Sequence, residues 1–116
     1  MDYVRLGTSG LKVSRICLGT NMYGAGYVDD ARAVSAIDHA FEQGINFIDT
    51  ADSYNAGRSE EVVGRAVKDR RHDFVIGTKA ANPSGPGVND KGLSRKHLIQ
   101  AVEASLRRLG TDYIDL

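Results

Sequence analysis

The chain has 116 residues, and its 15 basic and 15 acidic side chains give a formal net charge of zero. This balance argues against a nucleic-acid-binding protein, which needs a clustered positive surface. Hydrophobic residues make up 41% of the chain and charged residues 26%, as in a folded globular protein rather than a disordered one. A chain of this length normally forms one domain.

Cysteine content and hydropathy bear on disulfides, metal sites and the cellular compartment of the protein. The single Cys17 excludes a disulfide within the chain, and no Cys/His group has the spacing of a zinc site, so we expect no metal. The first residues lack the apolar core of a signal peptide, and no run approaches the ~18 apolar residues of a membrane span. We therefore expect a cytoplasmic protein with no membrane segment.

The first part of the chain predicts a hairpin, a strand and a helix. The turn-forming segment 7–10 lies between two short apolar runs, and a third apolar run follows it. Residues 29–43 then have apolar side chains at helical spacing. Asp29 or Asp30 can cap the start of this helix, and Gly44 can end it.

The rest of the chain alternates strands with helices. Residues 45–49 and 74–79 are short, apolar, strand-like runs, and residues 113–116 begin another. Between these runs, Ser59 and Ser94 are predicted to cap two more helices. The positions expected to be buried on these helices are Val62, Val63, Ala66, Val67, Leu98, Ala101, Val102, Ser105, Leu106 and Leu109.

Strands that alternate with helices indicate an α/β protein with parallel strand pairing. An open doubly wound sheet and a closed (β/α)8 barrel both fit this order, and spacing alone does not choose between them. The segment 19–26 follows the first parallel strand, where a nucleotide-binding loop would lie. It has neither the G-x-G-x-x-G pattern nor the lysine of a P-loop, which disfavours a Rossmann site.

Three ionisable residues follow the predicted strands. Asp49 ends one strand, Tyr54 comes five residues later, and Lys79 ends the next strand. Each of them alone would be interpreted as a turn or surface residue. In a barrel, however, the carboxyl ends of the strands face one mouth, where such enzymes place their chemistry. Together the three residues predict a catalytic group.

These residues lie within a pattern that resembles a known family. Residues 47–54, followed by Gly57 and Ser59-Glu60, resemble the aldo-keto reductase signature. The segments 5–14, 18–20, 78–79, 92–97 and 105–115 also resemble that family. The resemblance implies a (β/α)8 TIM barrel with a hairpin at its amino-terminal face. It also implies that residues 1–116 are the N-terminal portion of one such barrel domain, comprising the hairpin, about four strands and three helices.

The resemblance implies reduction of an aldehyde or ketone by hydride transfer from NADPH. Tyr54 would be the general acid that protonates the oxygen of the reduced carbonyl. A free tyrosine has a pKa near ~10, too high for efficient proton donation at neutral pH. A Lys79 ammonium nearby would lower it, and Asp49 would keep Lys79 charged and oriented.

The same resemblance assigns binding roles and a further catalytic residue. Cofactor contacts are expected from Gly19, Thr20, Asn21 and Asp49, and substrate contacts from Met22, Tyr23 and Tyr54. The family's catalytic histidine would lie beyond Leu116. We interpret His39, His72 and His97 as surface groups that do not replace it.

Two other functions remain open at this point. One is a regulatory subunit of the potassium-channel β type, which has the same fold and resembles the segment 92–97. The other is a truncated fragment with no activity of its own, because part of a barrel leaves strand edges unpaired. The favoured interpretation is a carbonyl reductase, with its carbonyl substrate and oligomeric state unspecified.

Overall fold

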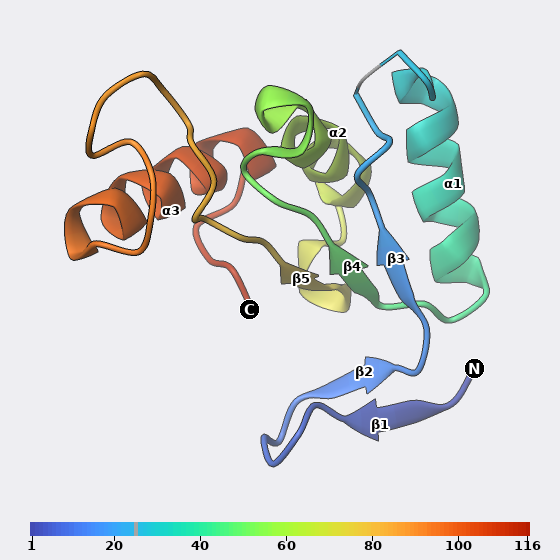
Figure 1. Cartoon of the computed structure of the whole chain (residues 1–116). Helices are drawn as coiled ribbons and strands as arrows, with labels where there is room; N and C mark the ends of the chain where they lie inside the picture. The colour runs from blue at the N-terminus through green and yellow to red at the C-terminus, as the bar shows by residue number, and fades with distance from the viewer. Residues whose placement is uncertain (25) are drawn as a thin grey trace.

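A computed structural model describes residues 1–24 and 26–116, and Ala25, from the segment 19–26, lies outside the described residues. Figure 1 shows the arrangement of the elements. They are β1 (Tyr3–Arg5), β2 (Lys12–Ser14), β3 (Cys17–Gly19), α1 (Asp30–Glu42), β4 (Phe47–Asp49), η1 (Tyr54–Gly57), α2 (Arg58–Val67), η2 (Arg71–Asp73), β5 (Val75–Gly77) and α3 (Arg95–Leu109). Across the described part of the chain, no helix is both long enough and apolar enough to span a bilayer.

The strands form the predicted hairpin and a parallel sheet. β1 and β2 pair antiparallel, while β3, β4 and β5 pair parallel in that order. Leu18, Ile48 and Ile76 lie opposite one another across the three strands. The α/β class and the parallel pairing are confirmed. The described residues supply three parallel strands, whereas a (β/α)8 barrel has eight.

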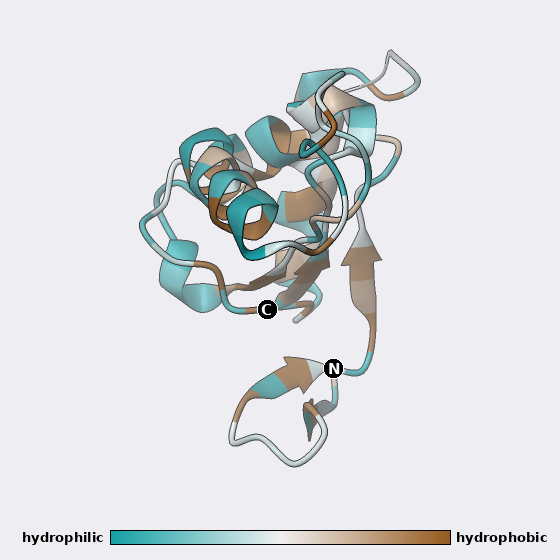
Figure 2. Cartoon of the chain, turned by 60° about the vertical axis from the view of Figure 1, so that its left-hand side comes forward, coloured by the Kyte–Doolittle hydropathy of each residue, from teal (hydrophilic) through white to brown (hydrophobic). Residues whose placement is uncertain are grey.

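The three helices lie side by side along the sheet, with α2 between α1 and α3 (Figure 1). Apolar residues gather on the strands and on one side of the helices (Figure 2). The core includes Ile37, Ile48, Val63 and Ile76, each fully buried. Gly64 is required where α2 approaches α3, because a Cβ at this position would lie 2.5 Å from the Leu109 carbonyl oxygen.

Most predicted helix ends are confirmed. The Asp29 carboxylate accepts a hydrogen bond from the Arg32 amide at 2.9 Å, and the Ser94 hydroxyl accepts one from the His97 amide at 3.1 Å. Each bond pairs a backbone donor that the first helical turn leaves free. Gly44 follows α1 with φ +86°, a left-handed conformation that favours glycine.

The predicted cap of α2 is wrong. The helix begins at Arg58 after Gly57, whose φ of +89° turns the chain into the helix, and Ser59 lies inside the first turn. The Ser59 hydroxyl is buried and bonds to the ends of neighbouring strands instead of to its own helix.

The predicted burial of three residues on α3 is also wrong. Leu98 and Val102 were expected to be buried but are 36% and 45% exposed. α3 contacts α2 through the face that buries Ala101 and Leu109, whereas Leu98 and Val102 face a hollow of about 510 Å³ beside residues 112–116. His97, expected at the surface, is only 2% exposed.

Residues 113–116, predicted to begin a strand, are not assigned as one. The segment nevertheless follows the outer edge of β5 (Figure 1). The Thr78 amide donates to the Leu116 carbonyl at 3.0 Å, and the Asp115 amide donates to the Ile76 carbonyl at 3.2 Å. These bonds pair backbone groups at the edge of β5.

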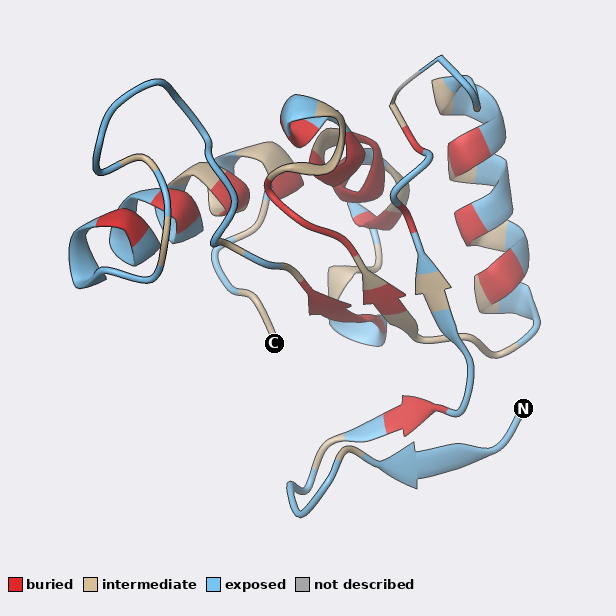
Figure 3. Ribbon diagram, in the orientation of Figure 1, coloured by how far each residue is buried: buried red, intermediate tan, exposed pale blue. Residues whose placement is uncertain are grey.

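The hairpin lies at the amino ends of the parallel strands. The Ser14 amide donates to Asn46 Oδ1 at 2.8 Å, and the Tyr3 hydroxyl donates to the Gly44 carbonyl at 2.9 Å. Most of the hairpin is exposed (Figure 3). This arrangement leaves the opposite edge of the sheet, at the carboxyl ends of the strands, open for a functional site.

Candidate active site

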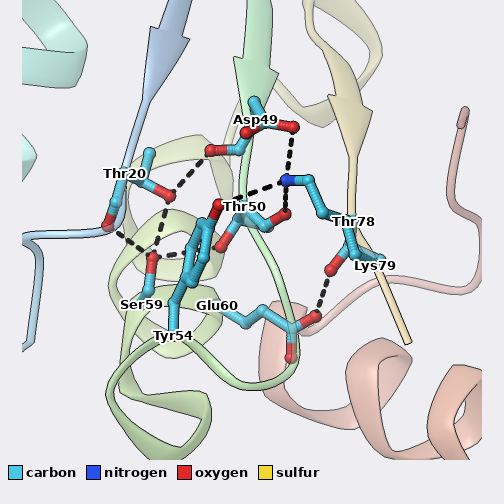
Figure 4. A network of polar contacts seen from close by, with 8 residues as sticks. All are labelled: Thr20, Asp49, Thr50, Tyr54, Ser59, Glu60, Thr78 and Lys79. Carbon is cyan, nitrogen blue, oxygen red and sulfur yellow. Dashed lines mark hydrogen bonds and ion pairs between the residues drawn. The ribbon is translucent and has the colours of Figure 1, made fainter. Parts of the chain in front are cut away.

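The carboxyl ends of the parallel strands bring the predicted catalytic residues together. Gly19, Asp49 and Gly77 lie opposite one another at the ends of β3, β4 and β5. Lys79 follows β5 by two residues, and η1 returns Tyr54 to the same edge. Figure 4 shows the Asp49, Tyr54 and Lys79 side chains converging there.

The Lys79 ammonium is the centre of this group. Its Nζ donates to Asp49 Oδ1 at 2.6 Å, to the Thr50 carbonyl at 2.8 Å and to the Tyr54 hydroxyl at 3.4 Å. An ammonium has three donors, so these contacts use all of them. The Tyr54 oxygen accepts from Lys79 and keeps its own proton available for another partner.

The electrostatics keep Lys79 charged. Partial burial by itself lowers the pKa of Lys79, but the hydrogen bonds to Asp49 and Tyr54 outweigh that effect and raise its pKa above the ordinary value. The side chains of Lys79 and Asp49 are 50% and 41% exposed. A molecule arriving from solvent can therefore reach them.

The turn that holds Tyr54 has an unusual backbone. Asn55 and Ala56 have φ values of +52° and +54°, in the left-handed region that residues other than glycine rarely adopt. Asn55 Nδ2 donates to the Asn21 and Tyr23 carbonyls, both at 2.8 Å. The loop after β3 thus supports the turn. Sequence reasoning missed Asn55, although asparagine tolerates this conformation better than most residues.

A buried hydroxyl cluster lies beneath the site. Ser59 Oγ is 2.8 Å from Thr20 Oγ1 and 3.0 Å from Thr50 Oγ1, and it also contacts the Thr20 carbonyl at 2.8 Å. All three residues are fully buried. The cluster joins the ends of β3 and β4 to α2. Thr20, predicted as a cofactor contact, has its hydroxyl within this cluster.

A buried ion pair supports the end of β5. Glu60 is fully buried and accepts from the Thr78 hydroxyl and from Arg108 Nε, both at 2.6 Å. Thr78 immediately precedes Lys79, so the pair fixes the strand end from which Lys79 projects. This role of Glu60 is not predicted from the sequence. A signal was present, because Glu60 has helical spacing with the buried Val63 and Val67.

The remaining predicted binding residues differ in exposure. Gly19, Asn21 and Met22 are exposed, and a Cβ at Gly19 would meet no atom within 4 Å. Tyr23 is instead 8% exposed and belongs to the core, where burial raises the pKa of its phenol. Of the predicted contacts on this loop, Gly19, Asn21 and Met22 are therefore accessible to solvent.

Known proteins are similar to this chain in sequence. The "Probable voltage-gated potassium channel subunit beta" of Arabidopsis thaliana is 44% identical over the whole chain, which covers 36% of that protein. The "Uncharacterized oxidoreductase YqkF" of Bacillus subtilis is 45% identical over 97% of the chain, again covering 36% of the relative. The chain thus spans little more than a third of the length of these curated relatives.

A solved structure agrees with the fold described above. The holo form of aldo-keto reductase AKR11C1 from Bacillus halodurans superposes with a TM-score of 0.87 at 41% identity. The match covers 98% of this chain and 38% of that structure. Residues 15–116 match the family model described as "Aldo/keto reductase family". The chain belongs to the aldo/keto reductase family.

Proposed function

We propose that the protein reduces aldehydes or ketones with NADPH and that Tyr54 is its general acid. The observation that supports this most directly is the use of all three Lys79 donors, which leaves the Tyr54 proton free. The carbonyl substrate then accepts that proton on its oxygen. We also propose that residues 1–116 are part of a (β/α)8 barrel, as family membership implies.

The residues at this edge of the sheet fit a nicotinamide cofactor. The surface at Gly19 is open, and the half-exposed Asp49 carboxylate can accept a hydrogen bond from a ribose hydroxyl. Asn21 lies on the same loop. When bound, NADPH supplies a hydride to the carbonyl carbon of the substrate. Met22 and Tyr54 would contact the substrate.

Lys79 assists the proton transfer from Tyr54 by stabilising the phenolate that the transfer leaves. At the observed 3.4 Å, this attraction is about 5 kcal/mol at an effective dielectric of about 20 and about 1 kcal/mol in bulk water. Lys79 is half-exposed, so the contribution lies between these values. Asp49 and the Thr50 carbonyl hold Nζ in place while the charge on Tyr54 changes.

A second candidate function is an NADPH-binding regulatory subunit of the potassium-channel β type. The observation that favours it is the 44% identity with the Arabidopsis protein. The identity with the bacterial oxidoreductase is 45%, so sequence identity does not separate the two functions. We favour the reductase because a Tyr54 proton left free beside Lys79 suits protonation of a reduced carbonyl. A protein that binds NADPH without turning over any carbonyl would favour the regulatory subunit.

The experiment is to measure NADPH oxidation by the full-length gene product with a panel of aldehydes and ketones. We expect Tyr54→Phe to lower kcat by about 10²–10⁴-fold. The affinity for NADPH, measured by fluorescence titration, should be unchanged. Tyr3→Phe is the matched control, because Tyr3 lies in the hairpin, at the opposite edge of the sheet from Tyr54. Full turnover by Tyr54→Phe would contradict the proposal.

A further inference from the structure

A second hollow lies behind the turn that holds Tyr54. It has a volume of about 350 Å³ and is bounded by the turn, by α3 and by the loop 82–92. The turn contributes Asp52, Ser53 and Ala56 to its wall, and α3 contributes His97, Ala101 and Arg108. Ser53 precedes Tyr54 and Ala56 follows it by two residues, so this hollow lies against the turn that holds Tyr54.

Two buried side chains in this wall have polar atoms without a partner. Asp52 is 9% exposed and His97 is 2% exposed. Asp52 Oδ2 and His97 Nε2 make no hydrogen bond to any described residue. Native proteins rarely leave buried polar atoms unpaired, because desolvation without a partner costs free energy. Both atoms therefore need an explanation.

Charged groups on α2 and α3 surround Asp52 in this wall. Burial, followed by the charge of Glu60 on α2, raises the pKa of the Asp52 carboxyl, and Arg108 and His97 on α3 oppose the rise. Arg108 Nε is already bonded to Glu60. The Asp90 carboxylate, in the loop 82–92, adds negative charge to the same wall. Among the described residues of this wall, His97 Nε2 is the buried polar atom that, like Asp52 Oδ2, has no partner.

Asp52 is also joined to the catalytic residues through the backbone. Its amide donates to the Lys79 carbonyl at 3.1 Å, and Tyr54 follows two residues later. The next two residues, Asn55 and Ala56, are in the left-handed conformation, which the surrounding contacts must hold in place. A restraint on the Asp52 side chain therefore restrains the start of this turn.

We propose that Asp52 and His97 are positioning residues that hold the Tyr54 turn against α3. Asp52 Oδ2 accepts a hydrogen bond from one ordered water molecule, and the same water bonds to His97 Nε2. A water needs room and two or more polar partners, and the hollow provides both. The effect on proton donation by Tyr54 rests on the proposed function, whereas the restraint on the turn does not.

The test uses Asp52→Asn and His97→Gln in the full-length gene product. We expect each variant to lower kcat by about tenfold to a hundredfold with KM and NADPH affinity unchanged, because the proton donor is displaced while the binding surface is intact. His39→Gln is the matched control, because His39 is an exposed histidine on α1. His97→Gln should also raise the pKa of Asp52 further, measured by ¹³C NMR of its carboxyl carbon.

Amide hydrogen exchange separates this inference from the proposed function. We expect faster exchange at residues 54–56 in both variants, with α1 amides unchanged as the internal control for folding. If the protein reduces no carbonyl but both variants exchange faster at residues 54–56, the proposed function is contradicted and the positioning role is supported. Unchanged exchange at residues 54–56, or a kcat equal to that of His39→Gln in a working reductase, would overturn the inference.

Discussion

Two carboxylate–cation pairs lie close together at the carboxyl edge of the sheet, and they differ in their access to solvent. Asp49–Lys79 and Glu60–Arg108 both close at 2.6 Å. The first pair is 41% and 50% exposed, whereas the second is 0% and 25% exposed. The two pairs therefore have the same chemistry but different roles. The exposed pair can meet a substrate, and the buried pair fixes the backbone from which the exposed pair projects.

Breaking the buried pair should have the largest effect on stability. Glu60→Gln leaves Arg108 without its counter-charge in a mostly buried place, so we expect a loss of about 3 kcal/mol in the free energy of unfolding. Urea denaturation measures this loss. The matched control is Glu61→Gln, because Glu61 pairs with Arg58 at the surface and should change stability by about 0–1 kcal/mol. Equal effects of the two variants would remove the distinction between buried and exposed pairs.

Removing one buried hydroxyl should have an intermediate effect. Ser59→Ala takes a hydrogen-bond partner from both Thr20 and Thr50, and we expect a loss of about 1–2 kcal/mol by urea denaturation. Ser35→Ala, on the exposed side of α1, is the matched control and should be near neutral. A neutral Ser59→Ala variant would mean that the hydroxyl cluster adds nothing to the support of the site.

The exposed pair should show the smallest effect on stability and a clear dependence on pH. The pKa of Lys79 is raised in the folded state above its ordinary 10.5. The stabilisation that the raised Lys79 pKa contributes is therefore fully present below pH 10.5 and is lost as the pH rises through the higher folded-state value. NMR titration should find Lys79 deprotonating above pH 10.5. Deprotonation of Lys79 below pH 10.5 would contradict the pairing.

Local patterns were sufficient to predict the order of the strands and α-helices as far as α3 and the convergence of Asp49, Tyr54 and Lys79 at one edge. Both follow from short-range rules, because apolar periodicity sets the strands and parallel strands end at one edge. The predicted caps at Asp29 and Ser94 were confirmed for the same reason. Their bonds join residues three positions apart.

The support beneath the site depends on contacts between residues far apart in the chain. Glu60 meets Arg108 across 48 positions, and Ser59 meets Thr20 across 39. Ser59 and Glu60 look like ordinary helix-start residues in sequence, which is why Ser59 is predicted as a cap and the buried ion pair of Glu60 is not predicted. His97 was misplaced for the same reason, since its burial depends on the turn and loop packed against α3.

The most direct test of the contrast between the two pairs is Lys79→Met, assayed for turnover and stability on one preparation of the full-length gene product. We predict that NADPH-dependent carbonyl reduction falls by at least about a hundredfold, while the free energy of unfolding changes by about 1 kcal/mol or less. Retained turnover together with a loss of stability as large as that of Glu60→Gln would contradict the account.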